Sequence, residues 1–322
     1  MAESVGDGVI AVAGEALVDV VPAPAEGYFE FAPGGSPANV AVGLARLGVP
    51  ARMLARLGTD LLGRRLRAHL ADNGVDLTHV VEATEQSSLA LVEVDAAGVA
   101  DYDFRIDGTA DWQWTAAELA GALDGPVVAV HSGSLALTQE PGAAALRGLL
   151  RSATGSATVS YDPNCRPRLM GSAADVLRGV YEMLEVADVV KVGDEDLRWL
   201  LPDREPGEVL DDWSSRGPAL VAITLGAEGV IAATGAGLRT SQPGRAVEVI
   251  DTVGAGDSFS AALLAGLHSR GLLGAASRKA LRDIEALVLD EVLEEAVTAS
   301  AITCSRRGAQ PPTAADLRDL LG

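Results

Sequence analysis

Short apolar runs alternate with stretches of helical periodicity along most of this 322-residue chain. The runs have the length of buried strands, and the longer stretches repeat apolar residues at the spacing of a helix face. We expect strands at Val9–Ala13, Val127–Val130, Thr158–Tyr161, Val189–Val192 and Leu220–Thr224, and helices at Ala38–Leu47, Leu61–Ala71, Gly142–Arg151, Ala173–Leu184 and Ser258–His268. This alternation predicts an α/β fold with a mostly parallel central sheet flanked by helices.

Two stretches interrupt the alternation. Leu17–Val21 and Ser88–Ile106 look like strands with no helix beside them, and the second reverses at Ala97-Gly98 as a hairpin does. We expect them to form a small antiparallel sheet that projects from the main domain. The corresponding insertions would span approximately residues 15–33 and 87–110.

The remainder of the chain gives no sign of a second domain. There is no internal repeat, low-complexity linker or clear boundary, so residues 1–322 are expected to form a single domain. Residues 271–300 are helix-rich and carry several acidic side chains, from which we expect one or two solvated helices.

Composition and charge exclude several classes of function. A net charge of −20 and a pI near 4.5 argue against nucleic acid or an anionic membrane as partners. Two cysteines and four scattered histidines provide neither a disulfide framework nor a metal cluster. The N-terminus does not resemble a signal peptide, and no apolar run is long enough to span a bilayer. We therefore expect a cytoplasmic protein.

The most informative motif is the loop Asp251–Asp257, which leads into an apolar helix. Gly254 and Gly256 permit a tight turn and expose backbone amides, and the helix that follows adds the positive end of its dipole. These features make an anion site, in which the Asp257 carboxylate would accept a proton from a group attacking the anion. The same residues also suit an ordinary strand–helix turn with Asp257 as N-cap.

Four further motifs follow strands or precede helices. Each suits a ligand site in an open α/β sheet, where ligands gather at the carboxyl ends of strands. Each also has an ordinary structural explanation as a turn, a helix start or a capping interaction. They are Gly14–Asp19, with Asp19 among apolar neighbours at a strand end, Gly34–Asn39 before a helix, Asp162–Pro167 and Ile223–Gly229. The sequence also lacks Gly-x-x-x-x-Gly-Lys-[Ser/Thr], so phosphate would be held by amides, arginine or a metal.

Taken together, these motifs resemble those of the ribokinase-like (PfkB) carbohydrate kinases. The two signature regions of that family are matched by Gly34–Gly48 and Asp251–Asp257. Other elements match in order and spacing over nearly the whole chain: Arg56–Asp60 with Gly63, Asp162–Arg166, Thr224–Gly226 and Gly308–Pro311. Within the family, the chain looks most like the bacterial fructokinases.

The resemblance implies an ATP-dependent transferase that phosphorylates a primary hydroxyl of a small sugar, with Mg²⁺ as cofactor. Asp257 would be the catalytic base, and a small β-lid would close over the sugar. The resemblance also allows a homodimer in which the faces of two lids pair. The remaining roles implied are an anion hole at Gly254, Ala255 and Gly256, sugar binding by Asp19, Gly34, Gly35, Asn39 and Arg166, and nucleotide binding by Thr224 and Gly226.

Two departures from the family pattern concern metal ions. The Asn-x-x-Glu motif that influences the magnesium shell falls on Gly193–Asp196, so the carboxylate would be Asp196, with Glu195 as the alternative. In many relatives a monovalent cation lies near the position of Asp251 and a serine of the C-terminal loop. That serine is replaced here by Pro312, which has no hydroxyl and weakens the case for potassium activation.

Fructose is the expected acceptor, and other functions remain as alternatives. A kinase of an acidic keto-deoxy sugar (2-keto-3-deoxygluconate or 5-dehydro-2-deoxygluconate) would need a cation in the pocket, for which Arg166 and Arg105 are available. A nucleoside kinase is less attractive because aromatic residues make up 4% of the chain. From other classes, a catalytically idle sugar-binding homologue would lack the base, and a dinucleotide-dependent oxidoreductase would need a Gly-x-Gly-x-x-Gly after an early strand.

Overall fold

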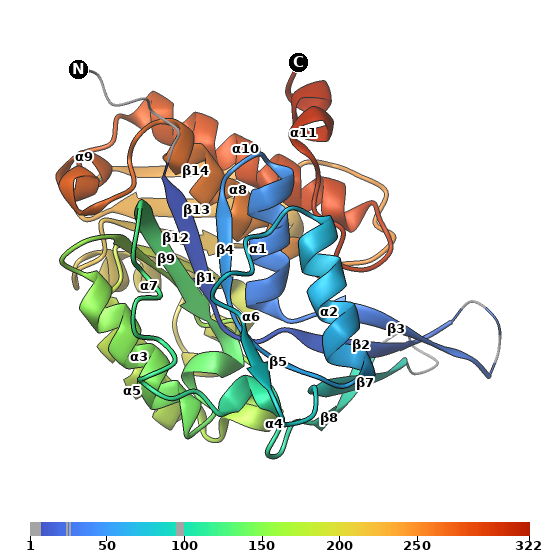
Figure 1. The fold of residues 1–322 in the computed structure, drawn as a ribbon. Coiled ribbons are helices and arrows are strands. Elements are labelled where there is room, and N and C mark those ends of the chain that lie inside the picture. Colours follow the sequence, from blue (N-terminus) through green and yellow to red (C-terminus); the bar gives the residue numbers. More distant parts are fainter. Residues whose placement is uncertain (1–7, 24, 26, 95–99) are drawn as a thin grey trace.

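The central sheet organises the molecule (Figure 1). The computed structural model describes residues 8–23, 25, 27–94 and 100–322. Eight strands lie in the order β14-β13-β12-β11-β10-β9-β1-β4, parallel from β12 to β4 and antiparallel at β13 and β14. Their bounds are Val9–Ala13 (β1), Ala51–Leu54 (β4), Val127–Gly133 (β9), Thr158–Asp162 (β10), Val189–Gly193 (β11), Leu220–Thr224 (β12), Gly229–Thr234 (β13) and Arg239–Pro243 (β14).

Helices cover both faces of this sheet, as the alternating pattern predicted (Figure 1). Alternate residues of one strand point to opposite faces. On β1, Ile10 and Val12 belong to one apolar core, and Ala11 and Ala13 belong to the other. The first core is covered by α1 (Ser36–Arg46), α2 (Leu61–Asp72), α8 (Ala255–Ser269) and α10 (Ala286–Cys304), and the second by α3 (Gly142–Ala153), α5 (Ala173–Leu184), α6 (Asp194–Leu200) and α7 (Pro206–Ser214). The α/β fold class is confirmed.

A second, four-stranded sheet projects from one side of the molecule (Figure 1). Its order is β3-β2-β7-β8, and its bounds are Leu17–Pro22 (β2), Phe29–Gly34 (β3), Leu89–Val94 (β7) and Ala100–Arg105 (β8). β2, β7 and β8 fall within the expected insertions, and β3 extends to Gly34, just past the first. The expected antiparallel pairing is present between β2 and β3 and between β7 and β8, whereas β2 and β7 pair in parallel at the centre of the sheet. Both strands leave the main domain in the same direction, which forces this pairing. The expected turn at Ala97-Gly98 lies outside the described residues.

Two further sequence expectations need correction. Asp19 lies within β2, opposite Ala32 and Ala90, and does not stand at a strand end. The acidic segment 271–300 is not simply solvated, because α10 packs along α8 and buries Val292, Leu293 and Ala296 completely. Its exposed acidic residues, Glu291 and Glu294, occupy only the outer face.

The other elements are short or peripheral. They are β5 (Arg56–Gly58) paired in parallel with β6 (Val81–Ala83), and the helices α4 (Pro167–Met170), α9 (Arg278–Arg282) and α11 (Ala314–Leu321). Among the helices described, none combines the length and apolar character needed to cross a membrane.

Candidate active site

The expected site residues gather at the carboxyl ends of the parallel strands. β10 ends at Asp162 and β11 at Gly193, while α1 and α8 begin beside them. The small sheet brings Asp19 of β2 to the same edge. This is the edge at which open α/β sheets bind ligands.

The Asp257 carboxylate is buried at the start of α8 and is held from two sides. Ser36 Oγ donates a hydrogen bond to Oδ1 at 2.7 Å, and Asn39 Nδ2 donates one to Oδ2 at 2.8 Å. Burial raises the pKa of Asp257, while these hydrogen bonds and the charge of Lys191 act in the opposite direction. The two sequence motifs that carried the family resemblance therefore meet at one carboxylate. Ser36 was not singled out by the sequence, although it stands inside the Gly34–Asn39 motif.

The glycines of these motifs allow close backbone approach. Gly35 has φ 99°, and a Cβ there would lie 2.7 Å from the carbonyl oxygen of Glu15. A Cβ at Gly34 would collide with the Asp19 carboxylate. Gly254 has φ 77° and precedes α8, where any larger residue would be strained and would contact Ala309. Both loops therefore require glycine at these positions.

The Asp19 carboxylate is close enough to Arg166 and Asp257 to interact with both electrostatically. Burial raises the pKa of Asp19 to about 6, with the Arg166 guanidinium opposing this shift and the Asp257 charge adding to it. Arg166 is oriented by its own loop, since Nη1 donates to Asn164 Oδ1 at 2.8 Å and to the Cys165 carbonyl at 2.9 Å. The Asn164 Nδ2 group is buried without a hydrogen-bond partner.

A buried ion pair lies directly behind the start of α8. Lys191 Nζ is 2.9 Å from Asp162 Oδ2, and both side chains are at most 8% exposed. A Cβ at Gly256 would lie 2.8 Å from Lys191 Nζ, so the ammonium touches the first turn of α8. Burial lowers the pKa of Lys191, whereas the charges of Asp162, Asp196 and Asp257 raise it. The pKa of Lys191 is therefore raised overall. One signal for this residue was present in the sequence: it is one of two lysines in the chain and lies in a predicted buried strand.

Asp196 is the inward-facing carboxylate of the α6 start, and Glu195 is exposed. Asp196 Oδ1 accepts a hydrogen bond from the Cys165 amide at 2.9 Å. Burial and the Asp162 charge raise its pKa to about 6, against the influence of Lys191. Within the described residues, no group of three or more His, Cys, Asp or Glu side chains is arranged to hold a metal ion alone.

The Asp251 carboxylate is occupied by backbone amides. Oδ1 accepts from Val253 at 3.0 Å, and Oδ2 accepts from Gly308 at 2.8 Å. The Ala255 amide also has an acceptor, the Thr252 carbonyl at 3.2 Å. These bonds fold the glycine-rich loop against the C-terminal loop.

Thr224 and Gly226 lie at the end of β12, next to β11. Thr224 Oγ1 is 3.5 Å from the Val192 carbonyl, at the limit of a hydrogen bond. A Cβ at Gly193 would lie 3.8 Å from the same hydroxyl. Thr224 therefore stands at the same edge of the central sheet as Asp162, two strands further along.

Two buried or partly buried carboxylates clamp the base of the small sheet. Asp111 Oδ1 accepts from the Ala16 amide at 2.9 Å, and Oδ2 accepts from Ser88 Oγ at 2.6 Å. Asp60 accepts from the Ser87 amide and hydroxyl, both at 2.8 Å. Ala16 and Ser88 immediately precede β2 and β7, so these bonds fix both points at which the sheet leaves the main domain.

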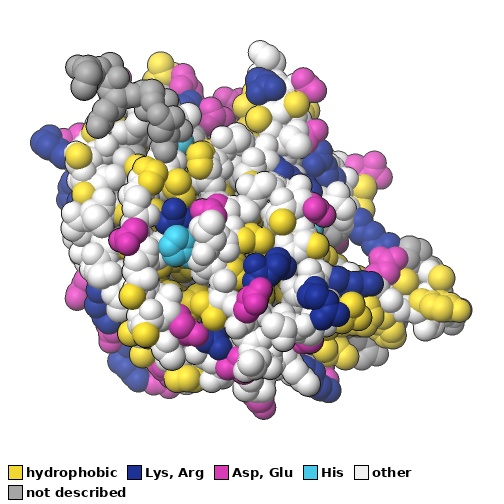
Figure 2. Space-filling model, in the orientation of Figure 1, with side chains coloured by type: hydrophobic (Ala, Val, Ile, Leu, Met, Phe, Trp, Pro, Cys, Tyr) yellow, Lys and Arg dark blue, Asp and Glu magenta, His cyan; other side chains and the backbone are white. Residues whose placement is uncertain are grey.

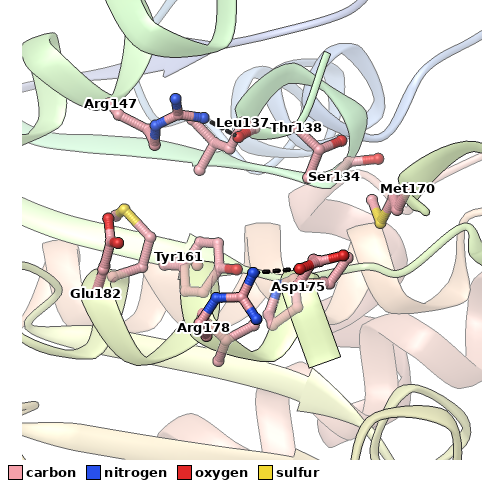
Figure 3. Close-up of a pocket in the computed structure, with 14 residues that line it drawn as sticks. Ser134, Leu137, Thr138, Arg147, Tyr161, Met170, Asp175, Arg178 and Glu182 are labelled. Atoms are coloured by element: carbon pink, nitrogen blue, oxygen red, sulfur yellow. Dashed lines mark hydrogen bonds and ion pairs between the residues drawn. The ribbon is translucent and has the colours of Figure 1, made fainter. Parts of the chain in front are cut away.

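A separate cavity of about 310 Å³ lies between α3 and α5, on the other face of the central sheet (Figure 3). Tyr161 forms part of its wall, with Arg147 and Arg178 on opposite sides. Both guanidinium groups are already paired, Arg147 with Glu140 and Arg178 with Asp175. None of the expected site residues lines this cavity, so it does not compete with the site at Asp257.

Comparison with known proteins places these features in context. The family model described as pfkB family carbohydrate kinase matches residues 8–316. Fructokinase-1 of Oryza sativa subsp. japonica is 35% identical over 327 residues, covering 96% of each chain. The solved fructokinase with bound ATP from Xylella fastidiosa superposes with a TM-score of 0.88 at 27% identity, covering 97% of this chain and 98% of that one.

A second solved structure adds ligands. It is a fructokinase double mutant from Vibrio cholerae O395 in a form with fructose, ADP and potassium ion bound. It superposes with a TM-score of 0.84 at 27% identity, covering 99% of this chain and 100% of that chain.

The buried Lys191–Asp162 pair generates a stability prediction. Lys191→Met should lower the free energy of unfolding by about 3–5 kcal/mol, because Asp162 is left as an uncompensated buried charge. The added change Asp162→Asn should restore part of this loss. Chemical denaturation followed by circular dichroism measures both effects.

The chain offers a matched control in its other lysine. Lys279 pairs with Asp283 at the surface, with the lysine side chain 88% exposed. Lys279→Met should change the unfolding free energy by no more than about 0.5 kcal/mol. Equal losses of unfolding free energy in Lys191→Met and Lys279→Met would contradict the conclusion that Lys191 compensates the buried charge of Asp162.

Proposed function

Because this chain belongs to the pfkB family of carbohydrate kinases, we propose that it is a fructokinase, which transfers the γ-phosphoryl group of ATP to a primary hydroxyl of fructose. The observation that carries this proposal is the Asp257 carboxylate, buried at a helix start and oriented by Ser36 and Asn39. The relatives with the same fold, which bind ATP or fructose with ADP, support the choice of substrates.

Asp257 is proposed as the base that accepts the proton of the attacking hydroxyl. A general base must be ionised near working pH and must be within hydrogen-bond reach of its proton. Burial makes the Asp257 carboxylate more basic, and its two hydrogen bonds favour its ionised form and fix its orientation. Asn39 uses one amide hydrogen on Asp257, which leaves its carbonyl oxygen available to a sugar hydroxyl.

The start of α8 is proposed to stabilise the negative charge of the phosphoryl group in transit. The Gly254 and Gly256 amides and the helix dipole would face the anion, and the Lys191 ammonium lies against Gly256. The Ala255 amide would contribute only after leaving its bond to the Thr252 carbonyl. Phosphoryl transfer depends mainly on this kind of positioning and charge stabilisation.

The charge around Asp19 favours a neutral sugar over a sugar acid. Asp19 and Asp257 both face the sugar space, and the charge of Asp257 makes Asp19 harder to ionise. Arg166 is the cation that opposes this effect on Asp19, whereas Arg105 is 60% exposed and pairs with Asp103. A substrate carboxylate would therefore meet two carboxylates and one guanidinium. Asp19, Gly34, Gly35 and Arg166 are proposed to bind hydroxyl groups of fructose.

Thr224 and Gly226 are proposed to border the nucleotide, with Asp196 directed at its magnesium ion. Mg²⁺ usually binds one or two carboxylates together with phosphate oxygens and water, and one inward carboxylate fits that pattern. When bound, Mg²⁺ would neutralise charge on the phosphate oxygens. No step is assigned to Asp251, whose carboxylate accepts two backbone N–H bonds.

The small sheet is proposed to act as a lid inserted into a single catalytic domain. It carries Asp19 into the site, and closing it over the sugar would exclude water that otherwise hydrolyses ATP. The clamps at Ala16 and Ser88 fix its base.

The outer part of this lid is also where we propose that a homodimer forms. Hydrophobic side chains gather on the projecting sheet (Figure 2), among them Tyr28, Phe29 and Phe31, which are 52–70% exposed. A second copy of the chain would cover this surface. Sedimentation velocity should report a dimer, and Phe29→Ser with Phe31→Ser should convert it to a monomer. A wild-type chain that sediments as a monomer at micromolar concentration would contradict the dimer.

Removal of the base should separate binding from catalysis. Asp257→Asn keeps the hydrogen-bonding shape but removes the proton acceptor, so fructose binding should persist while fructose-dependent ADP production falls by several orders of magnitude. Calorimetry and a coupled ADP assay measure the two quantities. Turnover close to that of the wild type would contradict the mechanism.

A substrate screen tests the choice of sugar. ADP release should be fastest with fructose, compared with ribose, 2-keto-3-deoxygluconate, 5-dehydro-2-deoxygluconate and nucleosides. Faster turnover of a sugar acid would overturn the charge argument at Asp19. Absence of turnover with every acceptor, together with measurable fructose binding, would favour a catalytically idle homologue.

A further inference from the structure

The C-terminal loop contacts the small sheet through one side chain. Arg307, which follows α10, donates a hydrogen bond from Nη2 to the Pro22 carbonyl at 2.9 Å. The same nitrogen lies 3.3 Å from Glu30 Oε2. Pro22 ends β2 and Glu30 lies in β3, so Arg307 holds the outer half of the hairpin that carries Asp19.

The next two residues of this loop contact the proposed anion hole. The Gly308 amide donates to Asp251 Oδ2 at 2.8 Å. Ala309 packs against Gly254, where an added Cβ would lie 2.7 Å from the Ala309 Cβ. Three consecutive residues therefore join the small sheet to the loop that precedes Asp257.

We propose that Arg307 is a positioning residue that couples closure of the lid to the geometry of the phosphoryl-transfer loop. With the lid closed, the Arg307 contacts fix the outer hairpin relative to Asp251 and Gly254. With the lid open, the two contacts are lost and the C-terminal loop is freed on that side. This proposal rests on the kinase function proposed above.

The Arg307–Glu30 contact is weak enough to break and re-form as the lid opens and closes. The Arg307 and Glu30 side chains are 48% and 53% exposed, so their ion pair is screened by solvent and weak. The bond to the Pro22 carbonyl adds a directional component that an ion pair alone lacks. A contact of this kind breaks and re-forms during each turnover, whereas a buried pair would hold the lid shut.

The neighbouring arginine provides a matched control. Arg306 lies in the same loop but pairs with Asp316 at 3.1 Å, at the start of α11 and away from the small sheet. Loss of Arg306 removes the same charge from the same loop and leaves the lid contact intact.

Steady-state kinetics of Arg307→Ala and Arg306→Ala test the coupling. Arg307→Ala should raise KM for fructose by about two- to fivefold, as expected for the loss of an exposed pair and one hydrogen bond. It should also lower the fructose phosphate formed per ADP released, because an unlatched lid admits water to the γ-phosphate. Arg306→Ala should leave both quantities within about twofold of wild type, since an exposed pair away from the lid contributes little. Equal values for the two variants would overturn the proposal.

Charge reversal distinguishes the ion pair from a general effect on folding. Arg307→Glu should impair KM and the coupling ratio more than Arg307→Ala, since it repels Glu30. Adding Glu30→Arg should recover part of that loss. If KM and the coupling ratio of the double variant are no closer to wild type than those of Arg307→Glu, the Arg307–Glu30 contact does not have the proposed role.

The rate of proteolysis measures how accessible the lid hairpin is, and it does so without any substrate. At protein concentrations low enough to dissociate the proposed homodimer, chymotrypsin can reach Tyr28, Phe29 and Phe31, which lie on the hairpin that Arg307 holds. Cleavage of Arg307→Ala should be about two- to fivefold faster than cleavage of Arg306→Ala. Equal cleavage rates would overturn the proposal. This readout keeps its meaning if fructose is not the acceptor, so failure of the latch and failure of the proposed substrate are distinguishable.

Discussion

A buried ammonium group offsets the negative charges gathered at the candidate active site. Lys191 bonds to Asp162, touches the first turn of α8 and acts electrostatically on Asp196 and Asp257. Carboxylates close together in a low-dielectric environment repel one another, and a nearby cation offsets that repulsion. The charge of Lys191 favours the ionised forms of Asp196 and Asp257, in opposition to burial, which raises the pKa of both. It does so in a chain with a net charge of −20.

The fold was largely predictable because its signals are local. Strands such as Val9–Ala13 and Leu220–Thr224 are short apolar runs, and α5 begins and ends at the predicted residues. The pairing of β2 with β7 was not predictable in the same way, because parallel pairing between distant segments leaves no mark in either one. The burial of α10 was also missed, since its acidic residues mark only the face turned to solvent.

The proximity of the candidate site residues could be inferred from the sequence where motifs imply a backbone geometry. Glycines in Gly34–Gly35 and Gly254–Gly256 signalled close backbone approach, and the structure explains them through Asp19, Glu15, Ala309 and Lys191. The partners of Asp257 were less accessible, because Ser36 and Asn39 lie 221 and 218 residues away from it in sequence. Asp111 and Arg307 carried no local signal, since their importance comes only from the segments they join.

The clamps at the base of the small sheet have a mechanical consequence. Asp111 holds Ala16 and Ser88, and Asp60 holds Ser87, so the points at which β2 and β7 leave the main domain are both fixed. β2 and β7 are hydrogen-bonded to each other beyond those points and cannot slide independently. A movement of the sheet that keeps these hydrogen bonds is a rotation about the line through Ala16 and Ser88. Asp19, three residues along β2 from that axis, sweeps only a short arc when the tip of the sheet travels far.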